Sequence, residues 1–178
     1  MEIYDLLKED HEKVKGLLNA LLGLRDDDDD TRKRLVAQIR DDLIPHARAE
    51  ESVFYNSLRS VDSSKDLAMH GYKEHLEAEG LLRLLQVEDK TNMSWRKTAE
   101  KLRDALLHHI SEEEGRMFEV ARNNFSAEEA TMMGDAFQKM KPEIKEEGLM
   151  GTTWDMIANM MPPRFTDSFR NSQSPPHR

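Results

Sequence analysis

Apolar residues recur every three or four positions along most of this chain, and that spacing is typical of amphipathic helices. The first series predicts a helix over about residues 2–24, with its apolar positions at Ile3, Leu6, Leu7, Val14, Leu17, Leu18, Leu21 and Leu22. A second series predicts a helix over about 31–59. Pro45 removes a backbone donor within it, so we expect a kink or break just before His46.

The same pattern continues after each short polar connection. The connection VDSSKD (61–66) precedes a predicted helix that ends at about residue 88, and DKTNMS (89–94) precedes another over about 95–123. SAEE (126–129) has the form of a capping box and should open a fifth helix that ends at about residue 147. Four long helices with short connections predict an all-α, antiparallel up-down-up-down four-helix bundle with an added C-terminal helix.

The segment 148–178 differs from the bundle predicted over 1–147. Trp154, Ile157, Met160 and Met161 suggest a short amphipathic turn or two, which we expect to cap one end of the bundle in preference to binding a membrane. The last dozen residues are polar and rich in proline and serine. We therefore expect them to form a flexible, disordered tail.

Composition narrows the class of protein. Charged residues make up 34% of the chain and aromatic residues 6%, which suits helices better than a β-sandwich. Cysteine is absent, which excludes disulfides, thiolate nucleophiles and iron–sulfur ligation. The formal net charge of −9 argues against nucleic acid or anionic lipid as a partner. The acidic start of the chain does not resemble a signal peptide, so we expect a cytoplasmic protein, either monomer or homodimer.

Two segments occur twice in the sequence at nearly equal spacing. DHEKVKGLL (10–18) matches EHLEAEGLL (74–82), and HARAEESVFY (46–55) matches HISEEEGRMF (109–118). The first two predicted helices therefore look like a rough copy of the third and fourth. Such a repeat predicts a bundle with an approximate twofold axis.

Within the repeat, four histidines and two glutamates occupy matching positions: His11, His46, His75, His109, Glu50 and Glu113. Each of the two His-xxx-Glu pairs places both side chains on one helical face. Imidazoles and carboxylates are costly to bury in an apolar core unless a partner offsets the loss of their hydration. A bound metal ion is such a partner. Nitrogen and oxygen ligands without thiolate fit iron or manganese. The alternative is a plain bundle with surface histidines.

Three further His-xxx-Glu pairs find no equivalent in the other half of the repeat, and we mostly discount them as further copies of the ligand motif. They are His70 with Glu74, His75 with Glu79, and His108 with Glu112. Asp10 and Glu74, each just before a histidine of the repeat, are expected to orient imidazoles if they do not simply face solvent.

Together the motifs, H…HxxxE(E)…H…HxxxE(E) over roughly residues 1–145, resemble the haemerythrin-like, His-His-Glu cation-binding domain family. The resemblance implies a four-helix bundle around a non-haem centre of two Fe ions with an oxo or hydroxo bridge. By position, it assigns His11, His46, His75 and His109 as terminal ligands and Glu50 and Glu113 as bridging carboxylates.

The third helix departs from the family pattern. Oxygen-carrying haemerythrins have HxxxH there, whereas the residue four positions before His75 is Gly71, and His70 should miss the metal. This leaves room at one iron for water, a small oxidant or another side chain. Tyr55 is our candidate ligand, since a phenolate binds ferric iron, with packing as a core aromatic as the alternative. Glu79 is a second candidate.

The resemblance implies a protein that reacts with or binds a small oxidant: hydrogen peroxide, O2 or NO. We favour peroxide or NO detoxification, of a catalase-like or peroxidase-like kind, because an open position beside a second metal allows an oxidant to be polarised by both. The alternatives are O2 or NO binding or sensing, and iron storage, all without turnover. The expected partner is a small molecule, with no nucleic acid and no membrane.

Overall fold

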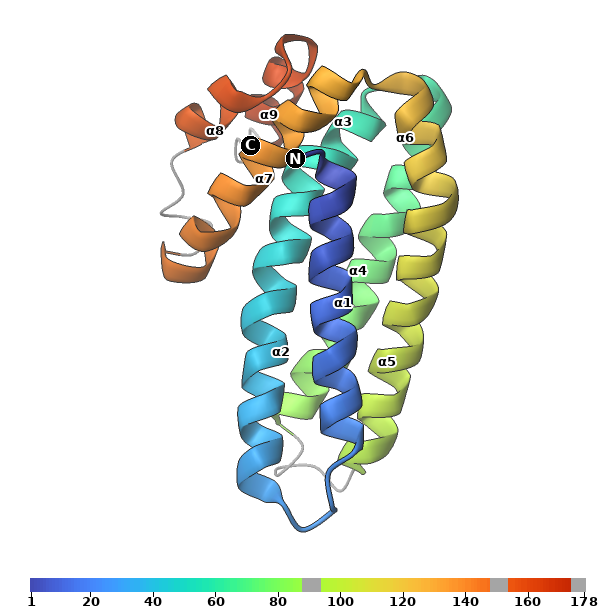
Figure 1. Cartoon of the computed structure of the whole chain (residues 1–178), viewed down its shortest axis with the longest axis vertical. Coiled ribbons are helices and arrows are strands. Elements are labelled where there is room, and N and C mark those ends of the chain that lie inside the picture. The colour runs from blue at the N-terminus through green and yellow to red at the C-terminus, as the bar shows by residue number, and fades with distance from the viewer. Residues whose placement is uncertain (88–93, 148–153, 174–178) are drawn as a thin grey trace, which may run out of the picture.

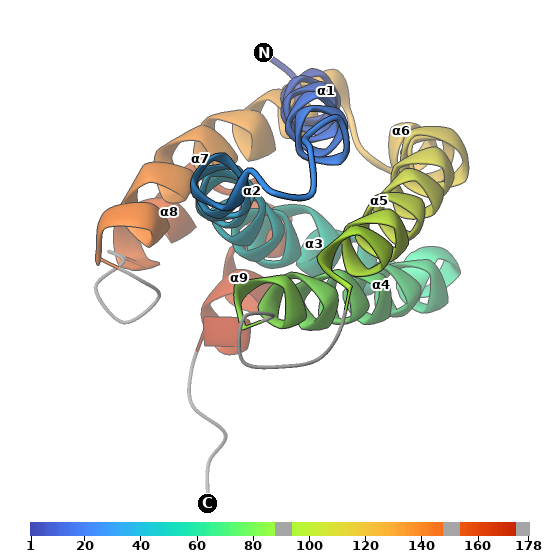
Figure 2. The same ribbon diagram turned by 90° about the horizontal axis from the view of Figure 1, so that it is seen from below.

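The computed structural model describes residues 1–87, 94–147 and 154–173, and all regular structure within these ranges is helical. Four long helices run side by side in alternating directions: α1 (Ile3–Leu22), α2 (Asp29–Glu50), α4 (Lys65–Gln86) and α5 (Trp95–Glu112) (Figure 1). The predicted all-α bundle is confirmed. Seen along the bundle, the four helices surround a common centre (Figure 2).

The second helix does not break at its proline. The chain stays helical through Pro45 to Glu50, so the expected break before His46 is wrong. The irregularity comes later, in the π-helical segment η1 (Glu51–Tyr55), after which α3 (Asn56–Arg59) completes the predicted helix.

The fourth helix contains the matching irregularity. Here α5 gives way to the π-helical segment η4 (Glu113–Met117) and then to α6 (Phe118–Asn124). The two π segments lie at nearly the same place in the sequence repeat, offset by one residue, and such insertions are frequent at functional sites.

The C-terminal third folds against one end of the bundle. The capping box is confirmed: the Glu129 amide donates to Ser126 Oγ at 3.2 Å, and the Ser126 amide donates to Glu129 Oε2 at 2.9 Å. It opens α7 (Ala127–Glu147), which lies beside α1 and α2 (Figures 1 and 2).

The remaining elements are the short η2 (Asp62–Ser64), α8 (Trp154–Met160), η5 (Pro163–Phe165) and α9 (Thr166–Gln173). The expected cap is α8, whose Ile157 is fully buried in the core. The expectation of a disordered tail over the last dozen residues is wrong for 167–173, because this stretch belongs to α9, which anchors Phe169 in the same core. Three stretches lie outside the described ranges: the predicted connection at 89–94 except Ser94, the start of the C-terminal segment at 148–153, and the last five residues.

The core consists of two apolar layers on either side of a polar one. One layer lies at the end of the bundle that α7, α8 and α9 cover, and includes Leu7, Phe54 and Phe118. The other lies toward the opposite end, and includes Leu18 and Leu102. Within the described residues, no helix is both long and apolar enough to cross a bilayer.

Candidate metal centre

The buried histidines and glutamates of the repeat meet in the polar layer. All are at most 5% exposed, and each imidazole directs Nε2 toward a carboxylate. The distances to Oε2 of Glu50 are 3.3 Å from His46 and 3.4 Å from His75, and those to Oε2 of Glu113 are 3.3 Å from His11 and 3.6 Å from His109. The Nε2 atoms of His75 and His109 are 3.2 Å apart. The predicted residues are therefore brought together.

The two carboxylates lack hydrogen bonds. Both oxygens of Glu50 and both oxygens of Glu113 are buried without a hydrogen-bond partner, as is Nε2 of His11. A buried polar group without a partner costs about 1–3 kcal/mol, and more when it is charged. A cation among these atoms would remove that cost, and the donor set fits iron or manganese. Two groups of ligand atoms lie close enough together to share an ion: His11, His109 and Glu113, and Glu50, His75 and His109.

In the absence of a cation, the two glutamates of the centre differ in pKa, and one of its histidines has a raised pKa. Burial and the negative charge of Glu50 raise the pKa of Glu113 well above its usual value. Burial acts the same way on Glu50, but the Glu113 carboxyl group, His46 and His75 outweigh it and lower the pKa of Glu50. Burial alone would lower the pKa of His75, yet its contacts with Glu50 and Glu51 raise that pKa to about 9. A cation that binds here must displace protons.

Each of the four buried histidines donates its other ring nitrogen to an acidic residue on a neighbouring helix. Nδ1 of His11 donates to Glu114 at 2.8 Å, that of His46 to Asp10 at 2.9 Å, that of His75 to Glu51 at 3.0 Å and that of His109 to Glu74 at 2.9 Å. Carboxylates only accept, so each bond places the proton on Nδ1 and leaves the lone pair of Nε2 for a metal. The four bonds link α1 to α2, η1 to α4, α4 to α5 and η4 to α1, in a closed ring.

Basic side chains and a tyrosine hold this ring of acids in place. Lys141 of α7 forms an ion pair with Asp10, and Arg48 forms one with Glu51 at 3.0 Å. The Tyr72 hydroxyl donates to the backbone carbonyl of Glu51 at 2.9 Å. The expected roles of Asp10 and Glu74 are therefore observed. Sequence reasoning missed the roles of Glu51 and Glu114, although the second glutamate of each repeated His-xxx-Glu-Glu motif was a signal for them.

Tyr55 fills the space that the third-helix position leaves. It is fully buried, its ring stacks on His75 at 5.2 Å between centroids, and its hydroxyl has no hydrogen-bond partner. A β-carbon on Gly71 would lie only 2.7 Å from two carbons of this ring and 2.9 Å from the hydroxyl oxygen. The space beside Gly71, where the family pattern has a histidine, is therefore filled by the Tyr55 ring. Burial and the nearby carboxylates raise the pKa of this phenol well above its usual value.

The other candidates lie elsewhere. Glu79, the second candidate for the open position, forms ion pairs with Arg48 and Arg83, so its carboxylate is turned toward those arginines. His70 misses the centre as expected, with 49% of its side chain exposed on α4.

A cavity of about 400 Å³ connects the centre with the surface. All four buried histidines line it, and α7 contributes Gln138, Lys141 and Lys145. Phe137 of α7 packs edge-on against His46 at 5.8 Å between centroids. The arrangement therefore allows a small molecule to reach the histidine side of the centre past α7.

Comparison with known proteins agrees with this geometry. The model of the hemerythrin HHE cation binding domain matches residues 2–121, which include all six predicted ligands from the repeat. The chain is 30% identical over 146 residues to a protein named DNA nickase from Nostoc sp. (strain PCC 7120 / SAG 25.82 / UTEX 2576). That match covers 82% of this chain but only 41% of the Nostoc protein. No solved structure gives a significant match. The family match spans most of the chain and contains the whole centre, so the chain belongs to the hemerythrin HHE cation-binding family.

Proposed function

We propose that Glu50 and Glu113 bridge two iron ions, with the four buried histidines as terminal ligands. The observation that carries this proposal is the pair of fully buried carboxylates whose four oxygens accept no hydrogen bond, although four imidazole Nε2 atoms surround them. Neither a packed apolar core nor a set of surface histidines accounts for that arrangement. The ring of acids around the histidines supports it, because ligand histidines in metal sites usually donate their second nitrogen to such a group.

We further propose that Tyr55 provides a phenolate ligand to one iron. Its hydroxyl is buried among carboxylates without a partner, and its ring is held between Gly71 and His75. The raised pKa of the phenol means that it loses its proton only when a cation faces it. The competing role, that of a core aromatic residue, would leave the hydroxyl without any interaction.

The chemistry that a bound pair of irons supplies is electron exchange with a small oxidant and polarisation of that molecule. The chain's own contribution is to hold the ligands and to limit access. The cavity between α1, α2 and α7 admits a small molecule to the histidines, while Phe137 and the apolar layers restrict the surrounding water. Peroxide, O2 and NO are all small enough to enter.

We infer that the function is detoxification of hydrogen peroxide or NO. The direct test is to add hydrogen peroxide to protein that carries two irons per chain and to record oxygen release. Two peroxide molecules should give two waters and one O2, and the activity should be lost in Glu113→Ala. A stable coloured adduct with peroxide, O2 or NO and no turnover of any of them would contradict detoxification, and would favour a binding or sensing role. Progressive uptake of many irons per chain would instead favour storage.

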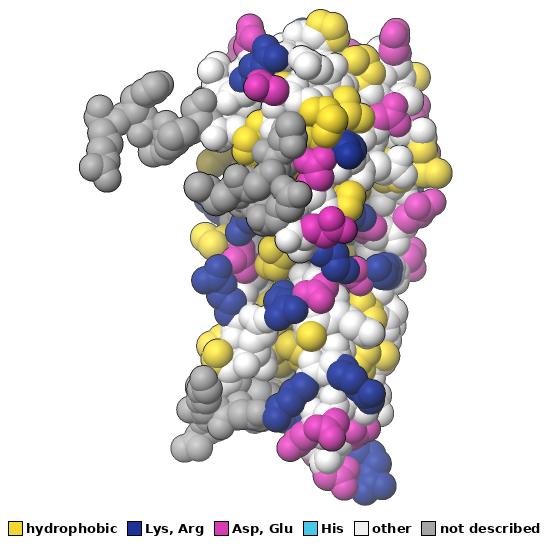
Figure 3. Space-filling model, turned by 90° about the vertical axis from the view of Figure 1, so that its left-hand side faces the viewer, with side chains coloured by type: hydrophobic (Ala, Val, Ile, Leu, Met, Phe, Trp, Pro, Cys, Tyr) yellow, Lys and Arg dark blue, Asp and Glu magenta, His cyan; other side chains and the backbone are white. Residues whose placement is uncertain are grey.

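Nicking of DNA, the activity in the name of the Nostoc relative, is not part of this proposal. The match covers only 41% of that protein. The net charge of the present chain is −9, which has the same sign as the charge of DNA phosphates. On the described part of the face in Figure 3, basic side chains are interspersed with acidic ones. We expect supercoiled plasmid to stay intact with the protein and magnesium, and nicking would add DNA as a substrate.

A further inference from the structure

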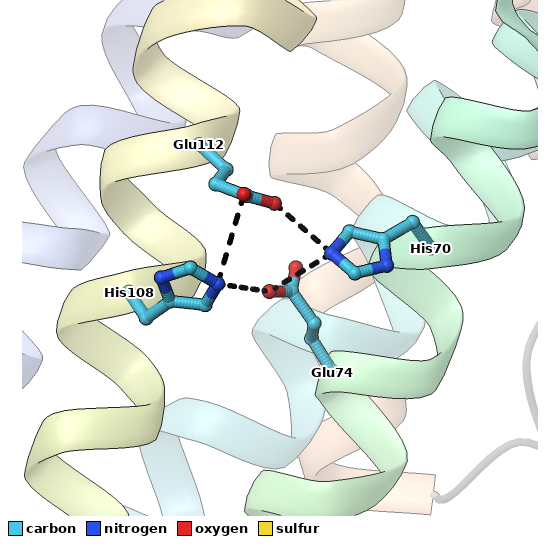
Figure 4. Close-up of side chains that lie close together, drawn as sticks. All are labelled: His70, Glu74, His108 and Glu112. Atoms are coloured by element: carbon cyan, nitrogen blue, oxygen red, sulfur yellow. Dashed lines mark ion pairs between the residues drawn. The ribbon is translucent and has the colours of Figure 1, made fainter.

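A second group of metal-ligand side chains lies outside the buried centre, between α4 and α5. We call it the outer cluster, and it consists of His70, Glu74, His108 and Glu112. Two i,i+4 pairs on adjacent helices direct their imidazoles and carboxylates toward one another (Figure 4). Two of the pairs discounted from the sequence therefore meet each other, because α4 and α5 bring them to the same height.

The spacing of the donor atoms fits a four-coordinate ion. Nε2 of His70 lies 3.4 Å from Oε1 of Glu74 and 3.0 Å from Oε2 of Glu112. Nε2 of His108 lies 3.7 Å from the same oxygen of Glu74 and 3.6 Å from Oε1, the other oxygen, of Glu112. A tetrahedral zinc site with bonds of about 2.0–2.1 Å has ligand atoms about 3.3–3.4 Å apart. Three of the four distances are longer than an ordinary hydrogen bond. One ligand atom from each of the four residues lies within 4.8 Å of the other three, which is close enough for them to share an ion.

Glu74 supplies an independent reason to expect a cation. Its Oε2 accepts the hydrogen bond from His109, whereas its Oε1, the atom that faces both histidines of the outer cluster, is buried and accepts no hydrogen bond. Leaving a carboxylate oxygen buried in this way is costly unless a positive charge faces it. The same carboxylate therefore joins the outer cluster to a ligand of the buried centre.

The cluster is open to solvent on one side. The side chains of His70 and His108 are 49% and 66% exposed, and a hollow of about 430 Å³ beside them is lined by His70, Glu112 and Arg116. An ion can therefore enter without any movement of the bundle, and water can occupy a further coordination position. We propose that the outer cluster is a second metal site, which binds a divalent transition-metal ion through two imidazoles and two carboxylates.

The test uses zinc as the probe and the iron-loaded protein as the sample. Protein dialysed against zinc should bind one zinc ion per chain while it keeps its iron. His70→Ala and His108→Ala should each weaken zinc binding by more than about tenfold, the loss that removal of even an outer partner of a ligand can produce. Glu77→Ala is the matched control, because Glu77 is exposed on the same helix and is not part of the cluster. It should bind zinc like the unmodified protein.

Unchanged iron content and melting temperature will show that the histidine variants are folded, since neither side chain touches the buried centre. Zinc bound with equal affinity by His70→Ala, His108→Ala and the unmodified protein would overturn the proposal and place the ion elsewhere, for example on the acidic 26–30 run. Failure to bind any zinc while the iron is retained would overturn it as well. Loss of iron in every sample would mean that zinc replaces iron in the buried centre. The titration would then be repeated at zinc concentrations too low to displace iron, where the outer cluster should still bind one zinc ion and the histidine variants should not.

Discussion

The contact between Tyr55 and Gly71 predicts opposite effects for two substitutions in the same helix. A glycine in a helix interior costs about 0.5–1 kcal/mol relative to alanine, so Gly→Ala should stabilise α4 wherever there is space. At Gly80 an added β-carbon meets nothing within 4 Å, and at Gly71 it meets the Tyr55 ring at 2.7 Å. Gly80→Ala should therefore stabilise the protein, and Gly71→Ala should destabilise it.

The size of the second effect follows from how tightly the ring is held. Carbon atoms in contact are normally about 3.5–4.0 Å apart, so the new β-carbon would overlap the ring by roughly 1 Å. The ring cannot move easily, because it stacks on His75 and packs edge-on against Tyr72 at 5.4 Å. Overpacking of this kind costs about 1–3 kcal/mol, which exceeds the helical gain of alanine.

Thermal unfolding followed by circular dichroism measures the difference. For a chain of this size, 1 kcal/mol shifts the melting temperature by about 2–4 °C. We expect Gly80→Ala to raise the melting temperature by a few degrees and Gly71→Ala to lower it by a similar or larger amount. In a Tyr55→Leu background the penalty of Gly71→Ala should largely disappear, a coupling that a double-mutant cycle detects. If Gly71→Ala were as stabilising as Gly80→Ala, the placement of Tyr55 against α4 would be wrong.

Three further predictions concern the buried centre. Glu51→Gln and Glu114→Gln should each weaken iron binding by about 10–100-fold, as measured by competition with a chelator, while Glu77→Gln should not. Uptake of iron by chelator-treated protein at pH 7 should release protons, because the pKa of His75 is raised to about 9 and that of Glu113 lies well above its usual value. Calorimetry in buffers of different ionisation enthalpy measures the number of protons released. The affinity for iron should rise with pH up to about 9. Iron uptake that releases no protons would contradict this prediction. Finally, ferric protein should show a phenolate-to-iron absorption band that Tyr55→Phe removes, and an unchanged spectrum would exclude Tyr55 as a ligand.

The sequence predicted which histidines and glutamates meet in the buried centre, for a physical reason. The constraint that fixes His46 with Glu50, and His109 with Glu113, is local: one helical turn places both groups on one face. The repeat then makes each pair recognisable against other acid-rich stretches. The fold followed from the same periodicity, which predicted the four long helices and α7.

Contacts between helices were not predictable in the same way. The ring of acids depends on which helix lies next to which, so Glu51 and Glu114 had no assigned role although they were repeated. Glu79 was a second candidate for the open position because it follows His75 by one turn, and Arg48 on α2 pairs with it. The outer cluster arises only because α4 and α5 are adjacent, which the repeat cannot indicate.

The C-terminal helix shows a different limit. Within 166–173, Phe169 is the only large apolar residue, so the pattern gives no helical signal. Its ring is nevertheless fully buried and lies 6.1 Å from that of Trp154 between centroids. Packing against the rest of the core therefore stabilises α9, which sequence periodicity cannot reveal.

The most direct test of the central claim is the number of irons per chain in the unmodified protein and in Glu113→Ala, with Glu119→Ala as an exposed control on α6. We expect two irons per chain in the unmodified protein and the control. Removal of the bridging carboxylate should reduce the number to one or none, together with a lower melting temperature, because metal binding contributes to folding. Two irons and unchanged melting in Glu113→Ala, or no iron in the unmodified protein, would contradict the account.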